Sequence, residues 1–126
     1  RNLLSPLGLD GKGVGVAVID SGISQPAAGD FACGANAPAC GPATASRVVY
    51  QENFSRDASN ATNPSDVLDG YGHGTHVAGI IGGNGAGSVV GGVARFPGVA
   101  PMVRLVNLRV LNGQGQGYGF RRDPGH

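Results

Sequence analysis

A short apolar run that ends in an acidic turn constrains the fold of this chain most strongly. Residues 14–19 are almost wholly apolar, glycines precede them, and Asp20, Ser21 and Gly22 follow at once. Such runs are typical of strands buried on both faces, as in a parallel sheet, and Ser-Gly indicates a turn. The segment therefore predicts a buried strand whose carboxyl end, where sites form in open α/β sheets, carries Asp20.

The rest of the chain alternates between apolar and glycine-rich segments. Strands are expected at residues 47–54 and 102–111, and a helix of small residues at 73–81. The segments at 21–46, 55–72 and 82–101 are rich in Gly, Pro or polar residues and are expected to be loops. Residues 112–119 favour no regular structure by propensity, but they could extend along a neighbouring strand. This alternation predicts an α/β layered fold.

The composition limits the classes of function that this chain can have. The 126 residues suffice for one domain with a modest core, and Gly accounts for 24 of them. Only 13% of the residues are charged and the net charge is +1, which gives no electrostatic case for binding nucleic acid. The apolar runs are too short to span a membrane. Residues 1–12 lack the charged segment followed by an apolar segment that is typical of a signal peptide, so we expect that the protein is cytosolic or that the chain starts after processing.

The two cysteines lie close together in the sequence. Cys33 and Cys40 are separated by Gly, Ala, Asn and Pro, which turn easily. A disulfide that closes this small loop is the favoured interpretation in an oxidising compartment, and two free thiols are the alternative. A zinc site is disfavoured because no second Cys or His pair lies nearby.

Asp20 and His73 are the candidates for chemistry. A helix N-terminus disfavours imidazolium, and a nearby carboxylate would hold the ring of His73 in one tautomer, ready to accept a proton. The plainer interpretations are a turn-capping Asp20 and a structural histidine, and His76, one turn on, is interpreted as structural. A metal site formed by Asp20, His73 and His76 is a weak alternative, because it lacks support from Glu or Cys.

Three segments together resemble a known family. The sequences VAVIDSGI (16–23), GHGTHVAGIIGG (72–83) and GVAPMVRLVNLRVLNGQGQG (98–117) are similar, in order and spacing, to the N-terminal part of the subtilisin-like serine proteases. The resemblance implies a three-layer α/β fold with a parallel sheet, of which residues 1–118 form an incomplete, N-terminal portion. Asp20 then matches the aspartate that orients the base, and His73 matches the general base.

The resemblance also implies a substrate-binding site and a cellular location. Leu111, Gly115 and Tyr118 align with the cleft that binds polypeptide substrates as an added strand, although a flexible loop is the alternative for this segment. The parent protein is expected to be a secreted endopeptidase. No cofactor or metal is evident from the residues, and calcium is suggested by the family alone. No nucleic acid or membrane partner is expected.

The nucleophile of such a protease is not recognisable in this sequence. None of the serines stands in the small-residue context, similar to GTSMA, that the family shows around its nucleophile. The C-terminal half of the catalytic domain is therefore expected to be missing, leaving an open sheet edge and uncovered apolar surface. We expect this chain alone to be inactive. The alternative is a non-catalytic remnant that binds extended peptides at residues 113–118.

Residues 119–126 depart from the family. A helix would follow here, often with a start similar to Ser-Asp-Val-Ile, but the chain reads GFRRDPGH, with a helix-breaking proline. One possible DNA sequence that encodes residues 119–126 encodes Gly-Ser-Asp-Val-Ile-Pro-Gly when its reading frame is shifted by one base. Our hypothesis is that residues 120–126 are an out-of-frame tail, and the alternative is a genuine divergent terminus or the boundary of an expressed segment.

Overall fold

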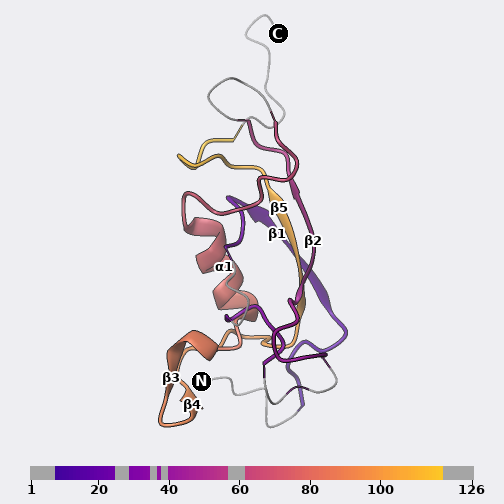
Figure 1. Ribbon diagram of the computed structural model, residues 1–126, viewed down its shortest axis with the longest axis vertical. Coiled ribbons are helices and arrows are strands. Elements are labelled where there is room, and N and C mark those ends of the chain that lie inside the picture. The colour runs from indigo at the N-terminus through magenta and orange to yellow at the C-terminus, as the bar shows by residue number, and fades with distance from the viewer. Residues whose placement is uncertain (1–7, 25–28, 35–36, 38–39, 57–61, 118–126) are drawn as a thin grey trace, which may run out of the picture.

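A three-stranded parallel sheet is the central feature of the computed structural model (Figure 1). Strands β1 (Gly15–Asp20) and β2 (Val48–Asn53) both pair with β5 (Arg104–Arg109), which gives the order β1-β5-β2. Asp20 at the end of β1 and Asn53 at the end of β2 lie opposite Arg109 in the register. The carboxyl ends of all three strands therefore meet at one edge. The structure describes residues 8–24, 29–34, 37, 40–56 and 62–117.

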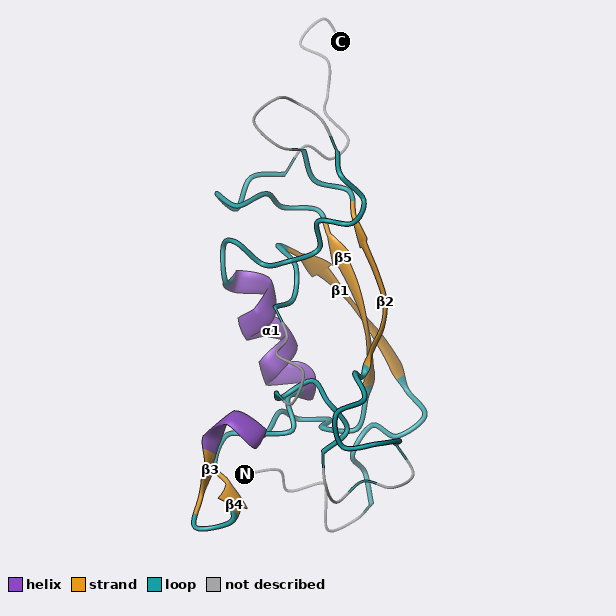
Figure 2. Cartoon of the chain, viewed as in Figure 1, coloured by secondary structure: helices purple, strands orange, loops and turns teal. Residues whose placement is uncertain are grey.

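Helix α1 (His73–Gly82) covers one face of this sheet (Figure 2). Ala78 on the helix is fully buried and packs in the core with Val18 of β1 and Leu105 of β5. The helix begins near the carboxyl edge of the sheet, so its first residues lie close to the end of β1. In the part of the chain that the structure describes, no helix has the length and apolar character needed to cross a membrane.

The opposite face of the sheet is exposed. Ile19 of β1 is 63% exposed, and Tyr50 of β2 is 53% exposed. The prediction of an α/β fold with a parallel sheet is confirmed, but the prediction that the first strand is buried on both faces is wrong. Around the parallel sheet the described residues form two layers, α1 and the sheet itself, and no described element covers the second face of β1.

Most predicted elements lie within one or two residues of their observed bounds, but one loop prediction is wrong. Residues 82–101 contain a 3₁₀ turn, η2 (Ala86–Ser88), and a hairpin of β3 (Val89–Val90) and β4 (Val93–Ala94). The hairpin turns at Gly91 and Gly92, whose φ angles of 60° and 77° suit a tight two-residue turn. A Gly-Gly pair between short apolar runs is itself a hairpin signal.

The loop that joins β1 to β2 is fastened at two points. Cys33 and Cys40 form a disulfide with an S–S distance of 2.01 Å, and Cys33 is buried. The guanidinium of Arg47, which is fully buried, donates hydrogen bonds to the carbonyls of Asp30, Ala32 and Val103. Burial lowers the pKa of Arg47 to about 10, with Arg104 adding to the effect, so the group stays charged at neutral pH. Arg47 thereby joins the disulfide loop to the sheet.

Candidate active site

The structure brings Asp20 and His73 together. Asp20 ends β1 and His73 begins α1, and the Nδ1 atom of His73 lies 2.9 Å from Oδ1 and 2.8 Å from Oδ2 of Asp20. The Asp20 side chain is only 14% exposed, whereas the His73 side chain is 59% exposed. The pair therefore has a carboxylate sheltered at the sheet edge and an imidazole open to solvent.

This contact determines what the imidazole can do. An ionised carboxylate only accepts hydrogen bonds, so the geometry assigns the proton of neutral His73 to Nδ1. The lone pair then resides on Nε2, which is available to accept a proton from a nearby hydroxyl. A nearby carboxylate also stabilises the imidazolium that such a transfer creates. Chemically, this arrangement can serve as an oriented general base.

Backbone contacts hold Asp20 in place. The N–H of Ser21 donates to Oδ1 of Asp20 at 2.7 Å. The carbonyl of Asp20 accepts hydrogen bonds from the N–H groups of Val110 and Leu111, at 2.7 and 3.1 Å. The segment that follows β5 therefore fixes the backbone of Asp20, and the N–H of Ser21 holds one oxygen of its carboxylate.

Two glycines allow the helix to approach the strand end. A Cβ atom on Gly74 would lie 2.3 Å from the carbonyl oxygen of Gly22, closer than any side chain could be placed. Gly22 has a φ of 114°, and a Cβ there would meet the carbonyl oxygens of Val67 and Leu68 within 3 Å. The glycines that flank Asp20 and His73 in the sequence are thus required by close packing between the two segments.

Asp69 is a site residue that sequence reasoning missed. Its carboxylate accepts hydrogen bonds from the N–H groups of Gly72 and Thr75 at the start of α1, and from the hydroxyl of Ser21. Burial by itself raises the pKa of Asp69, but these hydrogen bonds, those from Thr75 foremost, outweigh burial and lower it to about 2. An aspartate just before a predicted helix is a capping signal and could have revealed it.

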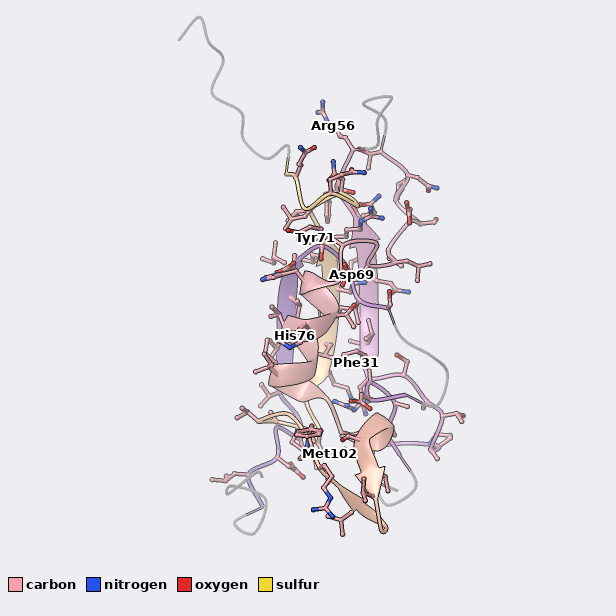
Figure 3. The ribbon with its side chains drawn as sticks, turned by 90° about the vertical axis from the view of Figure 1, so that its left-hand side faces the viewer. Phe31, Arg56, Asp69, Tyr71, His76 and Met102 are labelled. Atoms are coloured by element: carbon pink, nitrogen blue, oxygen red, sulfur yellow. A yellow bond between two sulfur atoms is a disulfide. The ribbon has the colours of Figure 1, made fainter. Side chains whose placement is uncertain are left out.

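His76 does not join the pair. It lies on the exposed side of α1 that Figure 3 turns toward the viewer, with the sheet behind, and it lines a cavity of about 610 Å³ together with Asp30, Ile80 and Phe96. Among the described residues no group of three His, Cys, Asp or Glu side chains could hold a metal ion. The three-ligand alternative of Asp20, His73 and His76 therefore has no counterpart in the described geometry. A calcium ion stays a prediction from family resemblance.

The glycine-rich segment after β5 folds back on itself. Leu111 and Gly117 form an antiparallel bridge, and the side-chain oxygen of Asn112 accepts hydrogen bonds from the N–H groups of Gln114 and Gln116. Gly115, at a φ of 75°, lies so close to the ring of Tyr71 that a Cβ would be 2.6 Å from it. Figure 3 shows Tyr71 near Asp69, beside the first turn of α1. Tyr118 lies outside the described residues.

Comparison with known proteins identifies the family. Residues 11–121 match the peptidase S8 model, described as the subtilase family. The chain belongs to the subtilase family. Membership accounts for the parallel sheet and for the order in which the subtilase segments around Asp20 and His73 occur. The match also reaches past residue 118, into the segment that the sequence suggested was divergent.

Curated subtilase relatives are serine proteases from bacilli. Serine protease AprX of Bacillus subtilis strain 168 is 34% identical over 109 residues, which cover 86% of this chain and 19% of AprX. An intracellular serine protease of Paenibacillus polymyxa is 37% identical over 107 residues, covering 85% of this chain and 26% of the relative. The major intracellular serine protease of B. subtilis is 34% identical, with 85% and 27% covered. The subtilase chain thus spans about a quarter or less of these relatives' lengths.

One solved structure similar to this subtilase chain is MycP1 from the ESX-1 type VII secretion system. It is 31% identical, and the match covers 95% of this chain and 24% of MycP1 with a TM-score of 0.48.

The relatives contradict one prediction. The sequence suggested a secreted protein, but the relatives from P. polymyxa and B. subtilis are named intracellular serine proteases. The resemblance on which that prediction rested concerns the catalytic segments, which do not report a compartment.

Proposed function

We propose that this subtilase chain supplies the aspartate and the general base of a serine endopeptidase that hydrolyses peptide bonds by acyl transfer. The observation that carries the proposal is the contact between Asp20 and Nδ1 of His73 in a member of this family. In the reaction, Nε2 of His73 takes the proton of a serine hydroxyl as the oxygen attacks the carbonyl carbon. The protonated ring then gives that proton to the leaving amine, while Asp20 stabilises its charge.

The serine nucleophile would come from the portion of a subtilase that this chain does not span. Ser21, the serine that adjoins Asp20 in the sequence, is fully buried, and its hydroxyl already donates to Asp69 and accepts from the N–H of Gly74. A hydroxyl held in this way is a poor candidate for attack on a peptide carbonyl. We therefore expect the 126-residue chain alone to hydrolyse no peptide.

The segment after β5 is the proposed border of the substrate cleft. It starts at Leu111, whose N–H contacts the carbonyl of Asp20, and it reaches Gly115 beside Tyr71. This position, next to the Asp20–His73 pair, supports a role for Leu111 and Gly115 in placing a polypeptide substrate. Tyr118, just beyond, is included in the proposal on family resemblance alone.

The first test compares this chain with a longer product. Coding DNA is read past His126, and both the 126-residue chain and the product that continues the subtilase domain are treated with a serine-directed phosphonate and a fluorogenic peptide. We expect labelling and hydrolysis only in the longer product. Labelling of the short chain would contradict the claim that its nucleophile lies elsewhere.

The second test addresses the pair itself. In the longer product, Asp20→Asn should lower kcat by about 10⁴, because an amide at this place holds the wrong histidine tautomer. Asp66→Asn, which changes an exposed carboxylate in the preceding loop, is the matched control and should leave kcat within about twofold. Equal loss in the two variants would overturn the assigned role of Asp20.

A further inference from the structure

We propose that Asp69 is a positioning residue that sets the distance between Asp20 and His73 by fixing the start of α1 to the end of β1. The catalytic meaning of that distance rests on the proposed function. The geometric claim does not, because it concerns a contact that can be observed without any reaction. Asp69 touches neither the ring of His73 nor the carboxylate of Asp20 through a hydrogen bond within the described residues, so it acts through its neighbours.

Asp69 first supplies the cap that α1 otherwise lacks. The helix has Gly72 as its N-cap residue, and Gly72 can offer no side-chain hydrogen bond. The carboxylate of Asp69 replaces it: Oδ1 accepts from the N–H of Gly72 at 2.7 Å, and Oδ2 accepts from the N–H of Thr75 at 2.8 Å. These donors flank His73 on both sides, so the carboxylate holds the backbone from which the imidazole projects.

Ser21 then connects the cap to the strand. Its hydroxyl donates to Oδ1 of Asp69 at 2.7 Å and accepts from the N–H of Gly74 at 2.8 Å. Its backbone N–H donates to Oδ1 of Asp20, also at 2.7 Å. One fully buried serine therefore lies between the two carboxylates and bonds both of them as well as the helix.

A closed ring of three hydrogen bonds braces the same junction. The N–H of Asp69 donates to Oγ of Ser24 at 3.1 Å, and the N–H of Ser24 donates to Oγ1 of Thr75 at 3.0 Å. The N–H of Thr75 donates to Oδ2 of Asp69 and completes the ring. The ring joins the loop before α1, the loop after β1 and the first turn of the helix.

The chemistry of this junction requires a carboxylate at position 69. Both oxygens receive donors, so an amide in their place would aim its own N–H₂ group at a donor on one of the two sides. Asp69→Asn should therefore break either the contact with Thr75 or the contacts with Ser21 and Gly72. The depressed pKa of Asp69 agrees with a carboxylate that is held ionised by its donors.

Nuclear magnetic resonance of the histidine ring tests the proposal. The 126-residue chain, uniformly labelled with ¹⁵N, is compared with Asp69→Asn by following the Nδ1 proton of His73. We expect this proton to exchange with water about tenfold faster in the variant, the effect of losing one hydrogen bond of ordinary strength. The amide signals of Leu105 and Ala78 in the core should stay dispersed, since the sheet and its helix contacts are unchanged.

Two further variants keep the test decisive. Asp66→Asn is the matched control, because Asp66 lies in the same loop but pairs with Arg109, and it should leave the His73 proton unchanged. Ser21→Ala removes only the connecting hydroxyl and should speed exchange of the His73 proton as Asp69→Asn does. Because both changes break the same connection, the variant that carries both should exchange no faster than the faster of the two single variants. The proposal would be overturned if the His73 proton exchanged at the wild-type rate in Asp69→Asn and Ser21→Ala, or if Asp66→Asn accelerated its exchange equally. Failure of the proposed function would instead appear in the labelling and hydrolysis experiments.

Discussion

The two carboxylates at this site, Asp20 and Asp69, have different hydrogen-bond partners and are connected by one serine. Asp20 faces the imidazole of His73, whereas Asp69 faces backbone N–H groups at the start of α1, and Ser21 bonds both. The difference follows from the donors each carboxylate meets. Asp69 receives enough of them to overcome the cost of partial burial, so its pKa falls on folding.

Acid should therefore weaken the fold through Asp69. Because its pKa is lowered from 3.8 to about 2 on folding, its stabilisation is complete above about pH 4 and is lost as the pH falls through about 2. We expect this contribution to be on the order of 1 kcal/mol, after allowing for solvent screening of a partly exposed group. Urea unfolding of wild type and Asp69→Asn between about pH 5 and pH 2 measures it. A stability difference that stays constant over this range would contradict the prediction.

The sequence singled out Asp20 and His73, which the structure brings into contact, but it did not single out Asp69. Asp20 and His73 occur in motifs whose residue types and order are specific to a family. Asp69 accepts mainly from backbone N–H groups, and its side-chain partner Ser21 is 48 residues away, so only its place before the predicted helix marks it in the sequence. Arg47 was missed for a related reason: its three acceptors are carbonyls, and only the fold brings them together.

At the scale of the element, the glycines of α1 have unequal roles. Gly74 lies under the turn that follows β1, where a methyl group would overlap the backbone of Gly22. Gly79, one turn further along the same helix, would meet nothing within 4 Å of an added Cβ. Close packing therefore requires a glycine at position 74, whereas no steric contact requires one at position 79.

This contrast gives a matched pair of substitutions. Gly74→Ala should lower the free energy of unfolding by about 1–3 kcal/mol, because the backbone of two segments must move apart. Gly79→Ala should raise it by about 0.5–1 kcal/mol, because alanine is the better helix former. Thermal or urea unfolding of both variants distinguishes them, and a stabilised Gly74→Ala would show that the close approach to Gly22 is not required.

The elements that the sequence revealed, β1, β2, α1 and β5, each have six residues or more. Strands β1 and β5 and helix α1 contribute core residues such as Val18, Leu105 and Ala78, and their patterns reflect burial. The hairpin of β3 and β4 was missed because its strands have two residues each and Val89, Val90 and Val93 are all exposed, so no burial pattern marks them. The bulge between Val48 and Tyr50 likewise has no signal in the sequence.

At the scale of the whole molecule, the sheet has one covered face and one bare face. Ile19 and Tyr50 lie on the face away from α1, and both outer strands, β1 and β2, present open edges among the described residues. Apolar faces and unpaired edges of this kind favour association with other chains. The curated relatives have about three-quarters of their length or more outside the match, which is ample chain to cover such a face.

We therefore expect the isolated 126-residue chain to self-associate through the bare face. Ile19→Lys should lower the associated fraction and the binding of a hydrophobic dye, because it places a charge on that apolar face. Leu9→Lys, which changes an apolar residue of similar exposure outside the sheet, is the control and should alter neither. Sedimentation at increasing protein concentration gives the comparison. Equal effects of the two variants would argue for a surface other than the sheet.

The central strand of the sheet, β5, is also the last strand among the described residues, and this order has a consequence for synthesis. Neither β1 nor β2 has a partner within the sheet except β5, so both must wait, unpaired, until residues 104–109 have left the ribosome. Both pairings are parallel and join segments far apart in sequence, which is the kind of contact that forms slowly. The nascent chain thus carries two strands without partners from their own synthesis until that of β5, and this interval is when a chaperone would have most to protect.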